Sequence, residues 1–96
     1  MKTKQELINL YYTNNVTSYK GIKWTDIFNS EQELMDIMYK MKDTRFSENK
    51  WVQMLVRYTD NGWELSEKQL KQLKRNAWIV AKLANDNHPN DEHIFC

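Results

Sequence analysis

Residues 66–85 read SEKQLKQLKRNAWIVAKLAN and decide the fold of this 96-residue chain. Ser66, with Gln69 three positions later, is the capping-box pattern that opens a helix. Apolar residues then recur at steps of three and four, the spacing of one helix face: Leu70, Leu73, Ala77, Val80 and Ala84. No Gly or Pro interrupts this pattern, so we predict one long helix over 67–85 whose apolar side is buried.

Two further capping boxes stand upstream. Thr3 with Glu6 opens a helix over about 4–14, and Ser30 with Glu33 opens one over about 31–42. The segment between these helices contains β-branched residues, Ser and Gly, and reads as a loop with a single helical turn at 24–28.

The second half of the chain predicts a helical hairpin. Ser47 is the expected cap of a helix over 48–60, and Gly62 stops that helix because Gly tolerates the left-handed conformation. Leu65 is placed to staple against Leu70 at the start of the next helix. Since the connection is short, the two helices should lie side by side as an αα-hairpin over 47–86.

Together these elements predict an all-α fold, a small bundle of about four helices with a C-terminal αα-hairpin and a short polar tail. The length supports one domain, which we place at 1–86, followed by a flexible tail at 87–96. Cys96 is the single cysteine and no stretch resembles a signal peptide or a membrane span, so we expect a cytoplasmic protein with no membrane partner, in the host cytoplasm if it is viral.

One face of the 67–85 helix is cationic although the net charge of the chain is only +1. We predict this face as an electrostatic docking surface for a partner protein, with two apolar anchors beside it: Lys68, Lys71, Arg75 and Lys82, with Trp78 and Ile79. Three alternatives stay open. The same cations, with Lys74, could neutralise the phosphates of a nucleic acid, they could be an ordinary solvated face, or the helix could pair with a second copy in a homo-oligomer.

Aromatic residues with interspersed lysines in the first third of the chain suggest a second candidate. Tyr and Trp rings can stack on bases while lysines meet phosphates, which makes nucleotide binding an alternative function. The candidate residues are Tyr11, Tyr12, Lys20, Lys23 and Trp24. The competing interpretation is that these aromatics belong to the core.

Metal binding and catalysis have little support. His88, His93 and Cys96 are ligand-type residues, but a structural zinc site needs a second pair of ligands that the chain lacks. The two glycines exclude a glycine-rich phosphate loop. We therefore predict no catalytic residues, no metal site, no cofactor and no enzyme activity.

Residues 49–75, NKWVQMLVRYTDNGWELSEKQLKQLKR, resemble a segment that recurs in small bacteriophage accessory proteins: an aromatic-led helix, a turn, and a second helix opened by Leu-Ser-x-Lys-Gln. The shared positions are caps and core residues, so the resemblance implies a folding unit and not a chemical site. Large apolar residues also exceed what one face per helix requires: Met35, Met54, Val56, Trp78 and Ile79. These features lead us to expect a non-enzymatic binding protein, a phage-type accessory factor or counter-defence inhibitor that contacts a host or defence-system protein.

Overall fold

The computed structural model describes residues 1–14, 22–86 and 94–95, and the regular structure in these residues is helical. The predicted all-α class is confirmed. The elements follow in the order α1 Lys4–Asn14, η1 Trp24–Asp26, α2 Glu31–Lys40, η2 Met41–Asp43, α3 Lys50–Asp60, α4 Glu67–Arg75 and α5 Trp78–Asp86, where η marks a short 3-10 turn. None of these helices is long and apolar enough to cross a bilayer.

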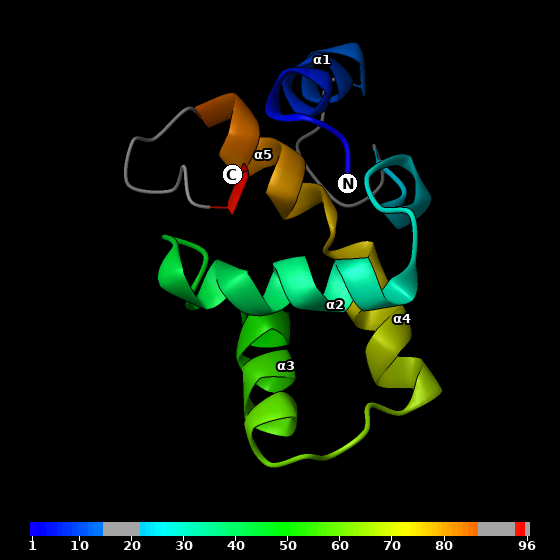
Figure 1. The fold of residues 1–96 in the computed structure, drawn as a ribbon, viewed down its shortest axis with the longest axis vertical. Coiled ribbons are helices and arrows are strands. Elements are labelled where there is room, and N and C mark those ends of the chain that lie inside the picture. Colours follow the sequence, from blue (N-terminus) through cyan, green and yellow to red (C-terminus); the bar gives the residue numbers. More distant parts are fainter. Residues whose placement is uncertain (15–21, 87–93, 96) are drawn as a thin grey trace.

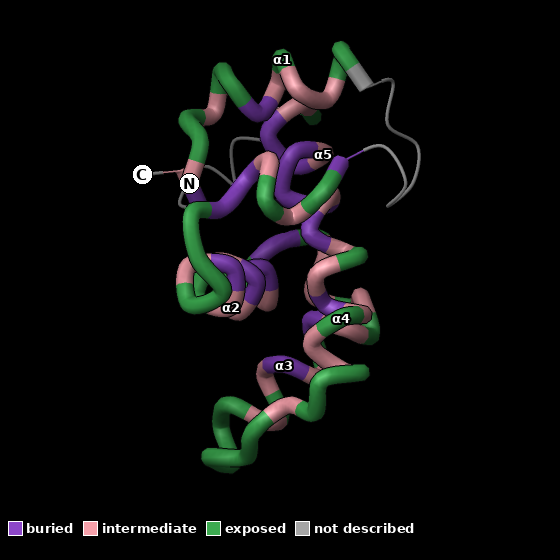
Figure 2. The backbone as a smooth tube through the Cα atoms, turned by 90° about the vertical axis from the view of Figure 1, so that its right-hand side faces the viewer, coloured by how far each residue is buried: buried purple, intermediate pink, exposed green. Residues whose placement is uncertain are grey.

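The helices form two groups that meet at α2. Helices α1 and α5 pack together at one end of the molecule, α2 crosses the middle, and α3 and α4 extend to the other end as the arms of a hairpin (Figure 1). Buried backbone concentrates in the middle, whereas the loop that joins α3 to α4 is exposed (Figure 2).

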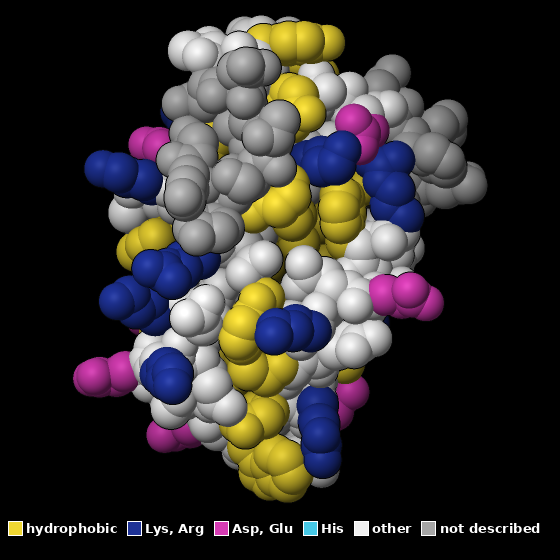
Figure 3. Space-filling model, turned by 180° about the vertical axis from the view of Figure 1, so that it is seen from behind, with side chains coloured by type: hydrophobic (Ala, Val, Ile, Leu, Met, Phe, Trp, Pro, Cys, Tyr) yellow, Lys and Arg dark blue, Asp and Glu magenta, His cyan; other side chains and the backbone are white. Residues whose placement is uncertain are grey.

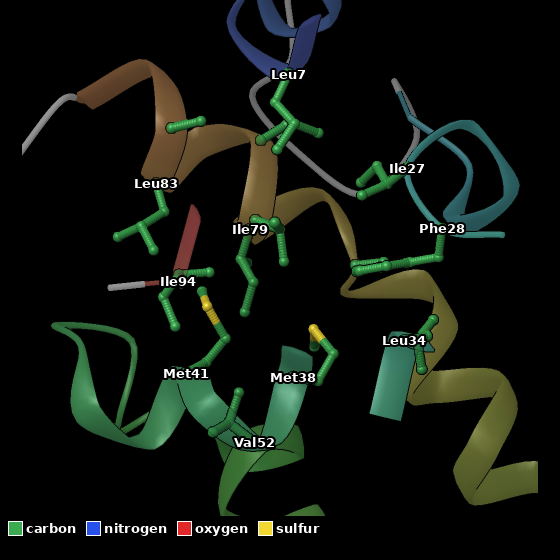
Figure 4. Close-up of a cluster of buried hydrophobic side chains, with 14 of the residues drawn as sticks. Leu7, Ile27, Phe28, Leu34, Met38, Met41, Val52, Ile79, Leu83 and Ile94 are labelled. Atoms are coloured by element: carbon green, nitrogen blue, oxygen red, sulfur yellow. The ribbon is translucent and has the colours of Figure 1, made fainter. Parts of the chain in front are cut away.

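A single apolar core joins the two groups. Leu7 of α1, Met38 of α2 and Ile79 of α5 are each at most 1% exposed (Figure 4). Fourteen further buried residues complete this core: Ile22, Ile27, Phe28, Leu34, Met41, Val52, Leu55, Leu73, Ala77, Val80, Ala81, Leu83, Ala84 and Ile94.

Local capping interactions set the start of three helices as expected. The Thr3 hydroxyl accepts a hydrogen bond from the Glu6 amide, and the Glu6 carboxylate accepts one from the Thr3 amide, which lowers the pKa of Glu6. The Ser30 hydroxyl likewise accepts from the Glu33 amide at 3.1 Å. Ser66 and Gln69 form the complete reciprocal box.

The end of α3 is a Schellman motif. Gly62 has φ of 70°, its amide donates to the Thr59 carbonyl, and the Trp63 amide donates to the Tyr58 carbonyl at 2.8 Å. The Tyr58 and Trp63 rings meet edge to face at 5.4 Å. This motif ends α3 where predicted and turns the chain toward α4.

The prediction of one helix over 67–85 is wrong, because the chain bends at Asn76 and Ala77 between α4 and α5. The Asn76 side chain donates to the Gln72 carbonyl at 2.8 Å, and the Asn76 and Ala77 amides bond three residues back instead of four. The bend lets α5 pack on α1 while α4 continues the hairpin with α3.

The start of α3 also differs from the prediction. Asn49, not Ser47, is the cap, and its side-chain oxygen accepts from the Trp51 and Val52 amides. The Ser47 amide instead donates to the Thr44 carbonyl in a turn that follows η2. Because the backbone before Asn49 forms these turns, α3 begins at Lys50, two residues later than the predicted start at residue 48.

The expected tail at 87–96 lies mostly outside the described residues, but Ile94 and Phe95 are described and differ from the expectation. Ile94 is 2% exposed and lies between Leu83 and Met41 (Figure 4), and Phe95 packs against the core. Burial of its apolar side chain explains why Ile94 is held in the domain.

Candidate functional site

Cationic side chains from two distant segments surround a hollow of about 290 Å³. Its floor and rim come from the segment around η1 and from the last turns of α4. We call it the basic hollow, and its lining residues are Ile22, Lys23, Trp24, Thr25, Lys71, Lys74 and Arg75. Figure 3, which views the molecule from behind, shows several Lys and Arg side chains along its left side, the side of α4.

The η1 wall of the hollow is held in place by hydrogen bonds within the turn and by the buried residues that follow it. The Asp26 carboxylate accepts a hydrogen bond from the Lys23 amide at 3.1 Å, and the Ile27 and Phe28 amides donate to the Trp24 carbonyl. Ile27 and Phe28 are buried in the core. Trp24 is therefore held at the surface by a short turn whose next residues are fixed inside the domain.

The α4 wall follows from helical spacing. Leu73 points into the core at 0% exposure, and Gln69 donates to the Tyr58 hydroxyl at 2.8 Å, which fixes the rotation of α4 against α3. Lys71, Lys74 and Arg75 stand three and four positions apart and so share the opposite side. That side faces the η1 segment.

The charged side chains in the described lining of the hollow are cationic. The Lys74 ammonium lies 2.6 Å from the Glu31 carboxylate and 4.7 Å from the centre of the Trp24 ring, so its charge is balanced and one face of the ring is covered. Lys23, Lys71 and Arg75 are exposed around the same opening. The described lining contains no carboxylate. The arrangement suits an anionic group joined to an apolar body.

The six residues predicted for partner binding do not share one face. Lys71 and Arg75 line the hollow, and Lys68 is exposed on α4 outside it. Beyond the bend, Lys82 lies 3.3 Å from the Asp86 carboxylate, an acid that Arg45 also contacts at 2.7 Å.

The two predicted apolar anchors also lie beyond the bend. Ile79 is 1% exposed, so its prediction as a surface anchor is wrong: the bend turns it into the core. Trp78 is half-buried, and its buried indole N–H has no hydrogen-bond partner among the described residues.

The residues predicted for nucleotide binding are also divided. Lys23 and Trp24 line the basic hollow. Tyr11 and Tyr12 lie on α1, where their rings meet edge to face at 6.0 Å, and neither lines the hollow. Lys20 lies outside the described residues.

The sequence did not reveal that the two predicted groups share one site. Lys23 and Trp24 from one group meet Lys71 and Arg75 from the other, with Lys74 bridging them. Lys beside Trp at positions 23 and 24 and the cations at 71, 74 and 75 are visible in the sequence, but the pairing of the two segments depends on how α4 packs.

A second concavity of about 310 Å³ lies nearer the hairpin tip, between α2, α3 and α4. We call it the tip groove, and its lining residues are Met35, Leu55, Tyr58, Thr59, Trp63, Glu64, Leu65 and Leu70. Trp63 is 53% exposed, one of two large hydrophobic residues with such exposure among the described residues. Leu65 and Leu70, the predicted staple, line it together.

Metal ligands do not gather in the described part of the chain, where no three His, Cys, Asp or Glu side chains cluster. His88, His93 and Cys96 lie outside the described residues. Comparisons of this chain with protein-family models, with curated proteins and with solved structures found no match.

Proposed function

We propose that this chain is a non-enzymatic binding protein that docks an acidic partner protein on the basic hollow. The observation that carries the proposal is the convergence of Lys23, just before η1, and the cations of α4 around an apolar floor with no carboxylate in the described lining. Such a surface steers an acidic partner toward it and adds an apolar contact once the partner arrives.

A protein partner fits this surface better than a nucleic acid does. The Trp24 ring has one face covered by Lys74, which reduces its value as a stacking platform. Glu31 and Glu67 stand beside Lys71 and Lys74 at the next hollow along α4. A continuous chain of phosphates would meet these carboxylates, whereas a partner with local acidic charge would not.

The biological role we propose is that of a phage-type accessory factor that inhibits or adapts a host or defence-system protein by contact. The small size, the exposed Trp63 and the resemblance of the hairpin at 49–75 support this role. Binding by contact needs no chemistry from the chain, in keeping with a surface whose described features are charge and apolar area.

The test compares two charge-matched double variants as bait in bacterial lysate treated with nuclease. Lys71→Glu with Arg75→Glu reverses the hollow, and Lys2→Glu with Lys50→Glu reverses two exposed lysines that do not line it. We expect a protein captured by the wild type and by the control pair but lost from the hollow pair, with capture falling as salt rises. Equal capture by all three baits would refute the proposal, and retention on oligonucleotides at low salt would favour the nucleic-acid alternative.

A further inference from the structure

We propose that the basic hollow is one end of a longer groove, and that one segment of the partner protein fills it, acidic at the hollow and apolar at the tip groove. This inference rests on the proposed function and adds the polarity and length of the bound segment. It also gives the tip groove, which the charge argument does not use, a defined occupant.

The groove is continuous because neighbouring concavities share their walls. A middle section along α4 is lined by Glu31, Glu67, Leu70, Lys71 and Lys74. It shares Lys71 and Lys74 with the basic hollow and Leu70 with the tip groove. Figure 2 looks onto this side of the molecule, with α2 and α4 on either side of the view and α3 below.

Charge changes along this path. In the described lining of the basic hollow, the charged side chains are all cationic. Lys74 is paired with Glu31 in the middle section, and Glu64 is the one charged residue among the described lining of the tip groove. A polyanion is therefore favoured only at the end of the groove formed by the basic hollow. An occupant that begins acidic and ends apolar matches the whole path.

The tip groove is a preformed apolar receptor. The Schellman motif fixes the backbone of Trp63, and the edge-to-face contact with Tyr58 fixes its ring. Met35 and Leu70 are half-buried on the other walls. A rigid, exposed Trp beside aliphatic side chains is typical of residues that dominate interface energies, since little freedom is lost when a partner covers them.

The length of α4 sets the length of the occupant. Nine residues of helix span about 13 Å at 1.5 Å per residue, and an extended strand covers that distance with about four residues. Adding the residues that enter the two ends gives an occupant of about six to eight residues. A second copy of this chain would instead give concentration-dependent dimers.

The experiment uses a display library of random 12-residue peptides, selected on the wild-type protein. We expect enriched peptides with Asp or Glu at one end and Leu, Phe or Trp about four to six positions away. Each peptide is then measured against three proteins: the Lys71→Glu/Arg75→Glu pair, Trp63→Ala, and Tyr12→Ala as the control for loss of an exposed aromatic. Helicity by circular dichroism verifies that each variant is folded.

Both ends should matter, in different ways. The hollow pair should weaken binding at least about tenfold and flatten its salt dependence, and Trp63→Ala should weaken it at least about tenfold with the salt dependence unchanged. Replacing the apolar end of the peptide by Ala should remove its sensitivity to Trp63→Ala alone. Tyr12→Ala should bind as the wild type does.

The outcomes separate the two proposals. Peptides that depend on the hollow pair but bind Trp63→Ala normally would overturn the two-ended groove and leave the proposed function standing. A library that enriches no sequence over the Lys71→Glu/Arg75→Glu protein would overturn the groove inference, while equal capture by the three lysate baits is the result that overturns the proposed function. A dimer that dissociates on Trp63→Ala, with no peptide enriched, would assign the tip groove to a second copy and would also overturn the inference.

Discussion

Replacing Ile94 by Ala tests whether the end of the chain is part of the core. Ile94 is 2% exposed and lies between Leu83 and Met41. The change removes three buried carbons at about 0.8 kcal/mol each, so the lost transfer free energy is about 2.4 kcal/mol. A cavity adds to this cost, and we expect the free energy of unfolding to fall by about 3 kcal/mol.

Urea and thermal unfolding followed by circular dichroism measure this loss. For a domain of this size, about 3 kcal/mol corresponds to a fall in Tm of roughly 12–24 °C. Tyr12→Ala is the control, because Tyr12 is 69% exposed and its replacement should change the unfolding free energy by less than about 0.5 kcal/mol.

The reasoning fails if Ile94→Ala unfolds at the same urea concentration as the wild type. Such a result would place residue 94 outside the core and restore the flexible tail expected from sequence. A loss near 3 kcal/mol, by contrast, would show that Ile94 leaves the core in the same global transition that unfolds the domain.

Three further changes test local features of the fold. Gly62→Ala should lower the unfolding free energy by about 1–2 kcal/mol, because the new Cβ meets nothing within 4 Å and the cost is that of a left-handed residue alone; no loss in urea unfolding would contradict the Schellman assignment. Asn49→Ala should cost about 1 kcal/mol and Ser47→Ala clearly less, and the reverse order would return the α3 cap to Ser47. Folding lowers the pKa of Glu6, so its ionised form contributes stability above its ordinary pKa that is lost as the pH falls through the lower pKa of the folded state. Glu6→Gln should therefore make the loss of stability in acid less steep below the ordinary pKa of a glutamate. An unchanged profile of stability against pH would be evidence against the capping role.

The sequence predicted the features that depend on neighbours a few residues away. The reciprocal capping boxes at Thr3 and Ser66 and the stop at Gly62 lie where expected, because each needs only about one turn of chain to form. Ser30 caps its helix as expected, but the Glu33 carboxylate accepts from the Asn29 amide, so the predicted box there is only half formed. The all-α class follows from the same local signals.

The features that the sequence missed depend on packing between distant segments. An Asn residue such as Asn76 does not by itself predict the end of a helix. The bend there arises because α5 gains contact with α1 while α4 stays on α3. Ile94 follows a stretch without periodicity, so only tertiary burial places it inside. The basic hollow needs both the η1 segment and α4 in position, which explains why Trp24 and Lys71 were assigned to separate candidate sites.

Two of the four tryptophans stand at opposite ends of the groove, Trp24 in the basic hollow and Trp63 in the tip groove. The fluorescence of these two tryptophans can therefore report binding at each end of the groove. Covering the exposed indole of Trp63 shifts its fluorescence emission to shorter wavelength, while a carboxylate that draws Lys74 away changes the surroundings of Trp24. Single-tryptophan versions of the chain would therefore report which end a bound molecule reaches first, without any attached label.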